Sequence, residues 1–396
     1  MAHPFLGLGF NSWTQKFGRS AASAAALTLV VGAKFQDNVN GTDRGAVFIF
    51  DVNDLTTSTK VICETDTSIY DFFSDSVAIG DSKILVGMPQ ADINGSGSGA
   101  AYIYNLDGTG ETQFLASDGA SGDGFGISVA IGNSKIAIGA RDEDEGANNA
   151  GAVYVYNLDG TGEIKITASD AANSDSFGSA VAIGNNKLYV GAPGDDDGGT
   201  SAGSVYIYNL DGTGENKLTP SDSRSFAYFG NALAFGHDKI VVGAYSDDPF
   251  GAPPGGGSVY VFDADGTNEV KIRSSDVANG DDFGHAIAIG NNKIVVGAPS
   301  NDDDGSGSGS AYVFNLDGTG QVKITASDAA ADDNFGSSVA IGGDKIYVGA
   351  RYEDNANGTN SGAFYAYNLD GTGEVKVINP ENDNYAVFGW SMALGS

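Results

Sequence analysis

The chain repeats one segment of about 52 residues along most of its length. The repeat is clearest at residues 177–208, which read FGSAVAIGNNKLYVGAPGDDDGGTSAGSVYIY. Its first phenylalanine recurs at intervals of 52, 52, 52, 54, 52 and 53 residues, at Phe73, Phe125, Phe177, Phe229, Phe283, Phe335 and Phe388. A fixed period of roughly this size is typical of solenoids, propellers and arrays, because a single repeat cannot bury its own apolar face.

Each repeat contains four short strand patterns. Val181 and Ile183 alternate with alanines, which predicts a first strand of small and aliphatic residues near the centre of the fold. The pair Asn185-Asn186 predicts a tight hairpin to a second strand, because asparagine tolerates positive φ. A third strand follows at residues 205–208 and a short fourth strand begins at residue 217. Four antiparallel strands per repeat predict one propeller blade, and no stretch between repeats has a helical period.

The two ends of the chain complete each other in this pattern. Seven second strands end at glycines, but the repeat that begins near Leu27 has no first strand in register before it. Residues 388–394 have the first-strand pattern, and the chain ends there. We therefore predict an all-β, seven-bladed propeller spanning residues 25–396, in which blade one combines residues 27–63 with residues 388–395. Residues 1–24 lie outside the repeat as an N-terminal arm.

The Phe-Gly at the start of each repeat and the Val-Gly-Ala-Pro at residues 190–193 resemble the FG-GAP repeat, the unit of the integrin α-subunit propeller. The resemblance implies a seven-bladed propeller used mostly for binding. Calcium-binding repeats of that family resemble Asp-x-Asp-x-Asp-Gly-x-x-Asp between the first two strands. This chain has only Asn185-Asn186 there, so the family's calcium site is not carried over. The sequence NLDGTGEIKITASD at residues 157–170 also resembles repeat proteins of marine bacteriophages, cyanophages in particular.

Composition excludes several kinds of partner. The net charge is −31 and the pI is about 4.1, which disfavours binding to nucleic-acid phosphates or to an anionic membrane. No apolar run approaches the roughly 18 residues of a membrane-spanning helix, so membrane insertion is not expected. The single cysteine, Cys63, rules out an intrachain disulfide.

The loop after the second strand is acidic in every repeat. Carboxylates with glycine nearby can surround a hard cation such as Ca²⁺, which takes six to eight oxygen ligands. The alternative is a solvated loop whose aspartates hydrogen-bond their own backbone. If calcium is bound, the candidate ligands in the best-defined loops are Asp142, Asp144, Asp195, Asp197, Asp302 and Asp304.

Little in the sequence points to catalysis. The three histidines, His3, His237 and His285, fall in the arm or at different points of different blades. The recurrent Asp-Gly-Thr-Gly lacks the following helix and Lys-Ser/Thr pair of a phosphate-binding loop, which predicts a turn. We therefore predict a protein that is not an enzyme. A hydrolase that uses a carboxylate pair in the channel is the alternative.

The N-terminal arm contains more large apolar residues than is usual for a free tail. Exposed apolar groups gain about 25 cal/mol per Å² on burial, so the arm is expected to pack on the propeller or on a partner chain. Gly7 and Gly9 argue against a helix. An Ala-rich run, residues 21–31, slightly resembles a signal peptide, but it continues into a predicted strand. The residues expected to bind the partner are Phe5, Leu6, Leu8, Phe10, Trp13 and Phe17.

These observations predict a structural or binding propeller. The favoured interpretation is a virion protein of a marine phage, in the tail, a fibre or the capsid surface, fixed by its arm to other proteins of the particle. The alternative is a secreted or cell-surface adhesin, lectin-like, that binds a glycan or a protein of the host surface, either with or without calcium. Both interpretations place the protein in a virion or outside the cell.

Overall fold

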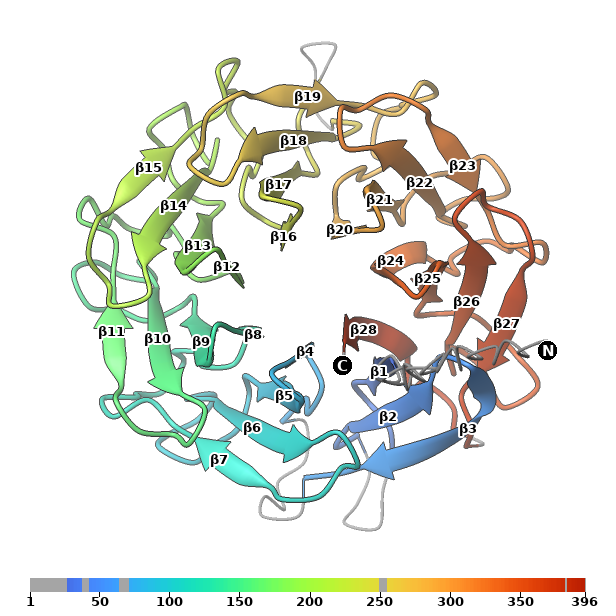
Figure 1. Ribbon diagram of the computed structural model, residues 1–396, viewed down its shortest axis with the longest axis horizontal. Coiled ribbons are helices and arrows are strands. Elements are labelled where there is room, and N and C mark those ends of the chain that lie inside the picture. The colour runs from blue at the N-terminus through green and yellow to red at the C-terminus, as the bar shows by residue number, and fades with distance from the viewer. Residues whose placement is uncertain (1–26, 38–42, 64–70, 249–254, 382, 396) are drawn as a thin grey trace, which may run out of the picture.

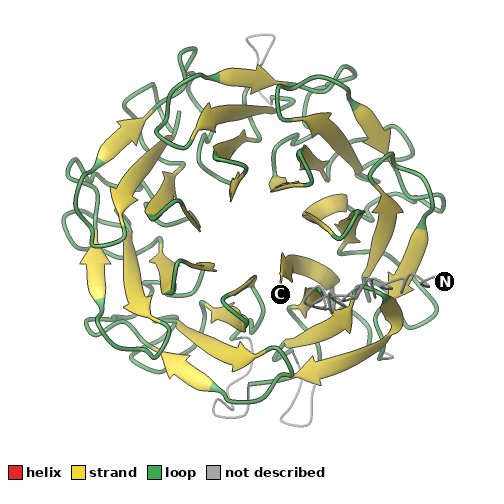
Figure 2. Ribbon diagram, in the orientation of Figure 1, coloured by secondary structure: helices red, strands yellow, loops and turns green. Residues whose placement is uncertain are grey.

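The computed structural model describes residues 27–37, 43–63, 71–248, 255–381 and 383–395. All regular elements in these residues are β-strands, which form seven four-stranded antiparallel sheets. Figure 1 shows the sheets side by side around one axis, and Figure 2 shows only strands and loops in the described chain. The predicted all-β, seven-bladed propeller is therefore confirmed. Among the described residues, no helix has the length and apolar character needed to cross a membrane.

Each blade places its first strand nearest the axis and its fourth strand on the outside (Figure 1). Blade four, for example, has the order β12 (Ala180–Gly184), β13 (Lys187–Ala192), β14 (Ser204–Asn209) and β15 (Asn216–Leu218). The inner two strands of the remaining continuous blades are β4 (Ser76–Gly80) and β5 (Lys83–Met88), β8 (Ser128–Gly132) and β9 (Lys135–Ala140), β16 (Leu233–Gly236) and β17 (Lys239–Ala244), β20 (Ala286–Gly290) and β21 (Lys293–Ala298), and β24 (Phe335–Gly342) and β25 (Lys345–Ala350). Their outer two strands are β6 (Ala100–Asn105) and β7 (Thr112–Phe114), β10 (Ala152–Asn157) and β11 (Ile164–Ile166), β18 (Ser258–Asp263) and β19 (Val270–Ile272), β22 (Ser310–Asn315) and β23 (Val322–Ile324), and β26 (Ala363–Asn368) and β27 (Val375–Ile378).

The ring closes through the C-terminal strand. Sheet order β28-β1-β2-β3 combines β28 (Phe388–Gly395) with β1 (Thr28–Ala33), β2 (Ala46–Asp51) and β3 (Asp54–Val61). Strand β28 runs antiparallel to β1, with Thr28 opposite Gly395 and Ala33 opposite Phe388. Pairing removes the two unprotected edges that an open ring would expose. This pairing is the closure that the sequence predicted. The predicted boundary between arm and propeller lies outside the described residues.

Two-residue turns join the first and second strands of the six continuous blades. In blade four, Asn185 and Asn186 have φ values of 49° and 55°. Positive φ at both central residues is the conformation of a type I′ turn, whose twist matches that of paired strands. The loop between the first two strands is therefore too short to hold a cation in the manner of integrin-type repeats.

Neighbouring blades approach most closely at the two glycines that define the repeat. A Cβ atom on Gly139, at the end of β9, would lie 2.1 Å from the carbonyl oxygen of Gly178, which follows Phe177 in the next blade. Gly178 itself has a φ of +91°, which favours glycine. The same contact, from second-strand glycine to Phe-Gly carbonyl, recurs for Gly87 with Gly126, Gly191 with Gly230, Gly243 with Gly284, Gly297 with Gly336 and Gly349 with Gly389.

The apolar core lies between the blades and widens away from the axis. Phe177 is fully buried, and its ring meets those of Tyr206 and Tyr208 edge-on at centroid distances of 5.3 Å and 6.1 Å. Near the axis the first strands carry Ala180 and Ala182 between larger residues. The predicted placement of a first strand of small and aliphatic residues near the centre is confirmed, and aromatic residues lie farther out on the third strand.

Removal of residues 386–396 should open the ring and lower the free energy of unfolding by more than about 4 kcal/mol, since it deletes a whole strand from blade one. The shortened protein should melt at a lower temperature or aggregate, as followed by circular dichroism and light scattering. Removal of Ser396 alone is the control and should leave the melting curve unchanged. An unchanged curve for the longer deletion would contradict closure by β28.

Candidate functional site

A lysine on the fourth strand of five blades lies among carboxylates from two different loops. In blade four, the ammonium of Lys217 is 2.7 Å from Asp170, 2.7 Å from Asp195 and 2.5 Å from Asp197. In blade three, Lys165 contacts Asp118 at 2.6 Å, Glu143 at 2.8 Å and Glu145 at 2.6 Å. The equivalent pairs elsewhere are Lys271 with Asp222 and Asp247, Lys323 with Asp276 and Asp303, and Lys376 with Asp328 and Glu353.

Cross-strand pairing explains why the lysine is found at this position. Lys217 on β15 is directly opposite Tyr206 on β14, and its ammonium lies 5.3 Å from the tyrosine ring centroid. The Tyr206 hydroxyl oxygen lies 2.8 Å from Asp170 and 3.0 Å from Asp195, so its single proton is shared between the two carboxylates. Asp195 begins the loop after β13 and is 3% exposed, whereas Asp170 belongs to the loop that arrives from blade three. The site therefore joins two blades at their outer ends.

A serine and a glutamate extend this contact. The Ser169 hydroxyl donates to Glu215 at 2.5 Å, and the Tyr208 hydroxyl donates to the same carboxylate at 2.8 Å. Glu215 and Lys217 of one blade thus hold Ser169 and Asp170 of the loop before it. We call this arrangement the inter-blade clasp. Its serine contacts recur between Ser117 and Glu163, Ser221 and Glu269, Ser275 and Gln321, and Ser327 and Glu374.

The charges in the clasp stabilise one another. Burial acts to lower the pKa of Lys217, but hydrogen bonds to Asp170, Asp195 and Asp197 outweigh it and raise the pKa above its ordinary value. Burial acts to raise the pKa of Asp170, but bonds from Lys217 and Tyr206 outweigh it and lower the pKa. Burial and then the Asp170 hydrogen bond raise the pKa of Tyr206, which therefore stays protonated as a donor.

Two blades depart from this pattern. Blade two has Gln113 in place of the lysine and Ala91 at the position of Asp195; the Gln113 amide donates to the Tyr102 hydroxyl at 2.8 Å. Blade one keeps Lys60, which contacts Glu381 at 2.6 Å, but has Phe48 in place of the tyrosine. The clasp therefore keeps its charge pair across the junction where β28 closes the ring.

The structure places the predicted metal ligands in two kinds of surroundings. Asp195 and Asp197 come together at Lys217. Asp144 instead accepts the backbone N–H of Asn149 at 2.8 Å, and Asp302 accepts that of Gly307 at 2.7 Å. The other two predicted ligands also lie apart from a carboxylate cluster: Asp142 is beside Arg141 at 3.3 Å, and Asp304 is exposed. The predicted arm residues Phe5, Leu6, Leu8, Phe10, Trp13 and Phe17 are outside the described residues.

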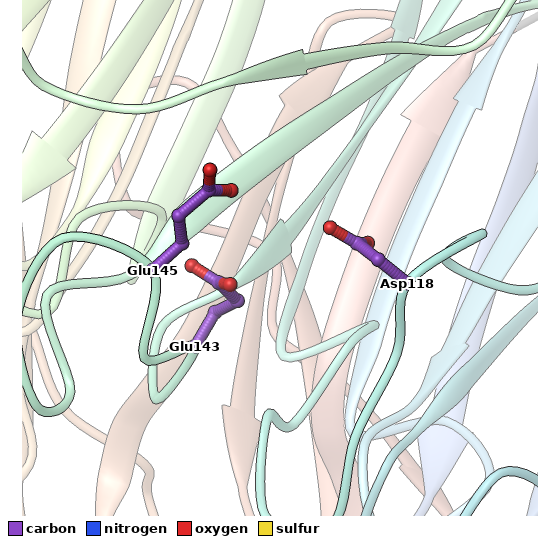
Figure 3. Close-up of side chains that lie close together, drawn as sticks. All are labelled: Asp118, Glu143 and Glu145. Carbon is purple, nitrogen blue, oxygen red and sulfur yellow. The ribbon is translucent and has the colours of Figure 1, made fainter.

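Sequence reasoning missed the carboxylates of blade three. Figure 3 shows Asp118, Glu143 and Glu145 directed toward a common space, with ligand oxygens within 4.8 Å of one another. The predicted ligands Asp142 and Asp144 are neighbours of these residues, whereas Glu143 and Glu145 occupy the repeat positions of Asp195 and Asp197. The available signal was the recurrence of Glu-x-Lys followed by Ser-Asp, as at residues 163–170.

The carboxylate clusters fit a calcium ion by chemistry but already surround a cation of the chain. Carboxylate oxygens are the ligands that Ca²⁺ prefers. At both clusters identified in the described residues, Asp118–Glu143–Glu145 and Asp170–Asp195–Asp197, a lysine ammonium lies within hydrogen-bond distance of all three groups. A calcium ion would therefore have to displace Lys165 or Lys217.

The histidines of the described residues are not paired with a nucleophile. His237 lies in a hairpin turn with a φ of 51° and accepts the N–H of Asn292 at 3.3 Å. His285 meets the ring of Tyr245, and burial, then the charge of Arg351, lowers its pKa to about 4. Nothing in the described chain points positively to catalysis.

A second layer of acids lies beneath the clasps. Asp175 is 3% exposed and accepts the N–H of Ala172 at 2.7 Å. Burial raises the pKa of Asp175 to about 6; the Ala172 N–H bond opposes this increase, and the charge of Asp195 adds a smaller one. In blade seven, burial also raises the pKa of Asp333 and of Glu353, which hydrogen-bond to each other. These groups make the stability of the propeller depend on pH.

The free energy of unfolding should rise as the pH is lowered from about 8 to about 5. An acid whose pKa is higher in the folded than in the unfolded chain takes up a proton on folding, so its contribution is lost as pH rises through the folded value. Asp175→Asn should flatten this dependence, by an amount on the order of 1 kcal/mol. Urea unfolding across this range tests it, with Asp211→Asn, in an exposed turn, as control. Equal slopes in wild type and Asp175→Asn would contradict it.

The clasp should appear as a coupling energy between blades. In a double-mutant cycle of Asp170→Ala and Lys217→Ala, the two changes should be non-additive by about 0.5–1.5 kcal/mol, because each removes the same partly exposed contact. Asp304→Ala combined with Lys217→Ala should be additive. Additivity in the first cycle would show that the ion pair contributes nothing to stability.

Comparison with known proteins is consistent with this architecture. The family model described as FG-GAP repeat matches residues 57–104, 109–156, 161–208, 213–262, 267–314 and 319–367. No curated protein sequence matches the chain. Among solved structures, a chain in a crystal structure of a nidogen/laminin complex is similar, with a TM-score of 0.45 and 9% identity over 80% of this chain and 97% of that chain. Because the family model covers well over half of its residues, the chain belongs to the FG-GAP repeat family.

Proposed function

We propose that this protein is a non-enzymatic propeller that serves as a rigid structural and protein-binding component of a larger assembly. The observation that carries the proposal is that the clustered polar groups of the described residues bind one another and so stabilise the fold. The most concentrated carboxylates are bound to lysines that join blades, and the histidines are apart from any nucleophile. Such a molecule offers a fixed surface, and FG-GAP propellers are generally binding or structural domains.

The assembly that we propose is a phage virion, with the protein in the tail, a fibre or the capsid surface. The support for this proposal is that the amino-acid sequence of its repeat resembles that of repeat proteins of marine phages. The N-terminal arm would anchor it, through Phe5, Leu6, Leu8, Phe10, Trp13 and Phe17. A few aromatic residues commonly supply most of the affinity at a protein interface, so a short arm suffices.

A second candidate is an extracellular adhesin that binds a protein or glycan of a host surface. Two exposed aromatic side chains favour it, since large apolar groups at loop tips are common binding contacts. Phe226, in the loop that enters blade five, is 49% exposed, and Tyr385, in the loop that enters blade one, is 58% exposed. A weakly bound calcium ion in the acidic loops would belong to this candidate.

A variant that starts at Ser23 tests the anchoring role. It should fold with the melting curve of the full chain but fail to enter particles or to oligomerise, as measured by co-purification with virions and by light scattering. A full-length Phe226→Ser, Tyr385→Ser variant is the matched control and should still assemble. Normal assembly of the shortened chain would contradict anchoring by the arm, and loss of host-cell binding in the control would favour the adhesin.

A further inference from the structure

The carboxylate cluster of blade three has the form of a cation site with an ammonium at its centre. Asp118, Glu143 and Glu145 each offer an oxygen within 4.8 Å of the others, and the Lys165 ammonium is 2.6, 2.8 and 2.6 Å from the three groups (Figure 3). Asp118 comes from the loop after β7, which joins blade two to blade three, and Glu143 and Glu145 come from the loop after β9 within blade three. A cation at their centre therefore holds blades two and three together.

The ammonium leaves part of this site unsatisfied. Glu143 is 7% exposed, and its second carboxylate oxygen, Oε2, has no hydrogen-bond partner among the described residues. A buried carboxylate oxygen without a donor carries a desolvation penalty. The adjacent Asp123 is 6% exposed, and its pKa is raised by burial and by the charge of Glu143. Glu143 thus contributes a buried oxygen ligand beyond the one that Lys165 uses.

The charge of the cluster also exceeds that of its lysine. Three carboxylates face one ammonium, so two negative charges stay unneutralised within it. A divalent ion would neutralise the cluster better than lysine does. Ca²⁺ accepts mono- and bidentate carboxylates in flexible geometry, whereas Mg²⁺ demands near-ideal octahedral coordination, so the cluster suits calcium. The lysine has the advantage of being covalently attached, which gives it a high effective concentration at the site.

We propose that Lys165 is a built-in cation that keeps a latent calcium site closed, and that its removal lets Ca²⁺ take over the task of joining the two blades. Lys217 occupies the Asp170–Asp195–Asp197 cluster of blade four in the same way, although both oxygens of Asp195 already accept hydrogen bonds there. This inference does not depend on the proposed function. It means that the wild-type propeller joins its blades without calcium. Other repeats of the family do bind calcium, between their first two strands.

Lys165→Met tests the proposal, because methionine removes the charge and keeps a similar side-chain length. The variant should bind Ca²⁺ in calorimetry with a dissociation constant of about 10⁻⁴–10⁻³ M, the range of weak extracellular sites. The Tyr154 hydroxyl donates to Asp118 at 2.7 Å, so Tb³⁺ bound in the cluster should also show tyrosine-sensitised luminescence that Ca²⁺ suppresses. The melting temperature of the variant should rise with Ca²⁺. Wild type should show none of these effects.

Matched variants separate this site from general calcium binding by an acidic protein. Lys135→Met removes a lysine that contacts the neutral amide oxygen of Asn157 at 2.7 Å and should gain no affinity. Adding Glu143→Gln to Lys165→Met should abolish the gain. Lys217→Met provides a second, independent site if the first variant folds poorly. The proposal is overturned if neither methionine variant gains calcium binding or calcium-dependent stability, or if wild type binds Ca²⁺ as tightly as they do.

Discussion

The close approach of neighbouring blades at paired glycines is the constraint on which the rest of the structure depends. At the boundary between blades three and four, a Cβ on Gly139 would lie 2.1 Å from the carbonyl oxygen of Gly178. Because the two backbones nearly touch there, Phe177 is forced into the space between the sheets, under Tyr206 and Tyr208. The angle between blades then requires small residues near the axis and aromatic residues farther out. One pair of motifs thus sets both the spacing and the core.

The inter-blade clasps act where this apolar packing ends. Burial of phenylalanine and tyrosine is favourable but not directional. It therefore fixes the distance between blades better than it fixes how their outer strands are aligned with each other. Ser169 and Asp170 arrive from one blade and meet Glu215 and Lys217 of the next at hydrogen-bond distances. Charged hydrogen bonds are short and oriented, so they set the position of the outer strands. Each boundary with a full clasp is therefore held at both ends.

The sequence was sufficient for the fold because the fold is periodic. The recurring Phe-Gly and the Asn185-Asn186 turn predict blade number and hairpins, since these depend on neighbours in the chain. Closure joins the two ends of the chain, and it is predictable because residues 388–395 supply the first strand that the N-terminal blade lacks. The candidate sites depend on contacts between residues 46 or 47 positions apart in adjacent blades, as in Ser169 to Glu215 and Asp170 to Lys217. Spacing along one strand does not reveal these contacts. For this reason the sequence alone indicates Asp142 and Asp144, and the cluster of Glu143, Glu145 and Lys165 becomes apparent only in the structure.

The strong acidity of the chain has more than one structural use. Aspartates of the Asp144 type close their own loops on backbone N–H groups, and aspartates of the Asp159 type form the turn after the third strand, with a hydroxyl of Thr161 at 2.6 Å. Those of the Asp170 type join blades through lysine. A carboxylate accepts several hydrogen bonds in different directions, which suits irregular loops between short strands. A net charge of −31 therefore follows largely from repeating these devices around the ring, and a bulk attraction for cations is not needed to explain it.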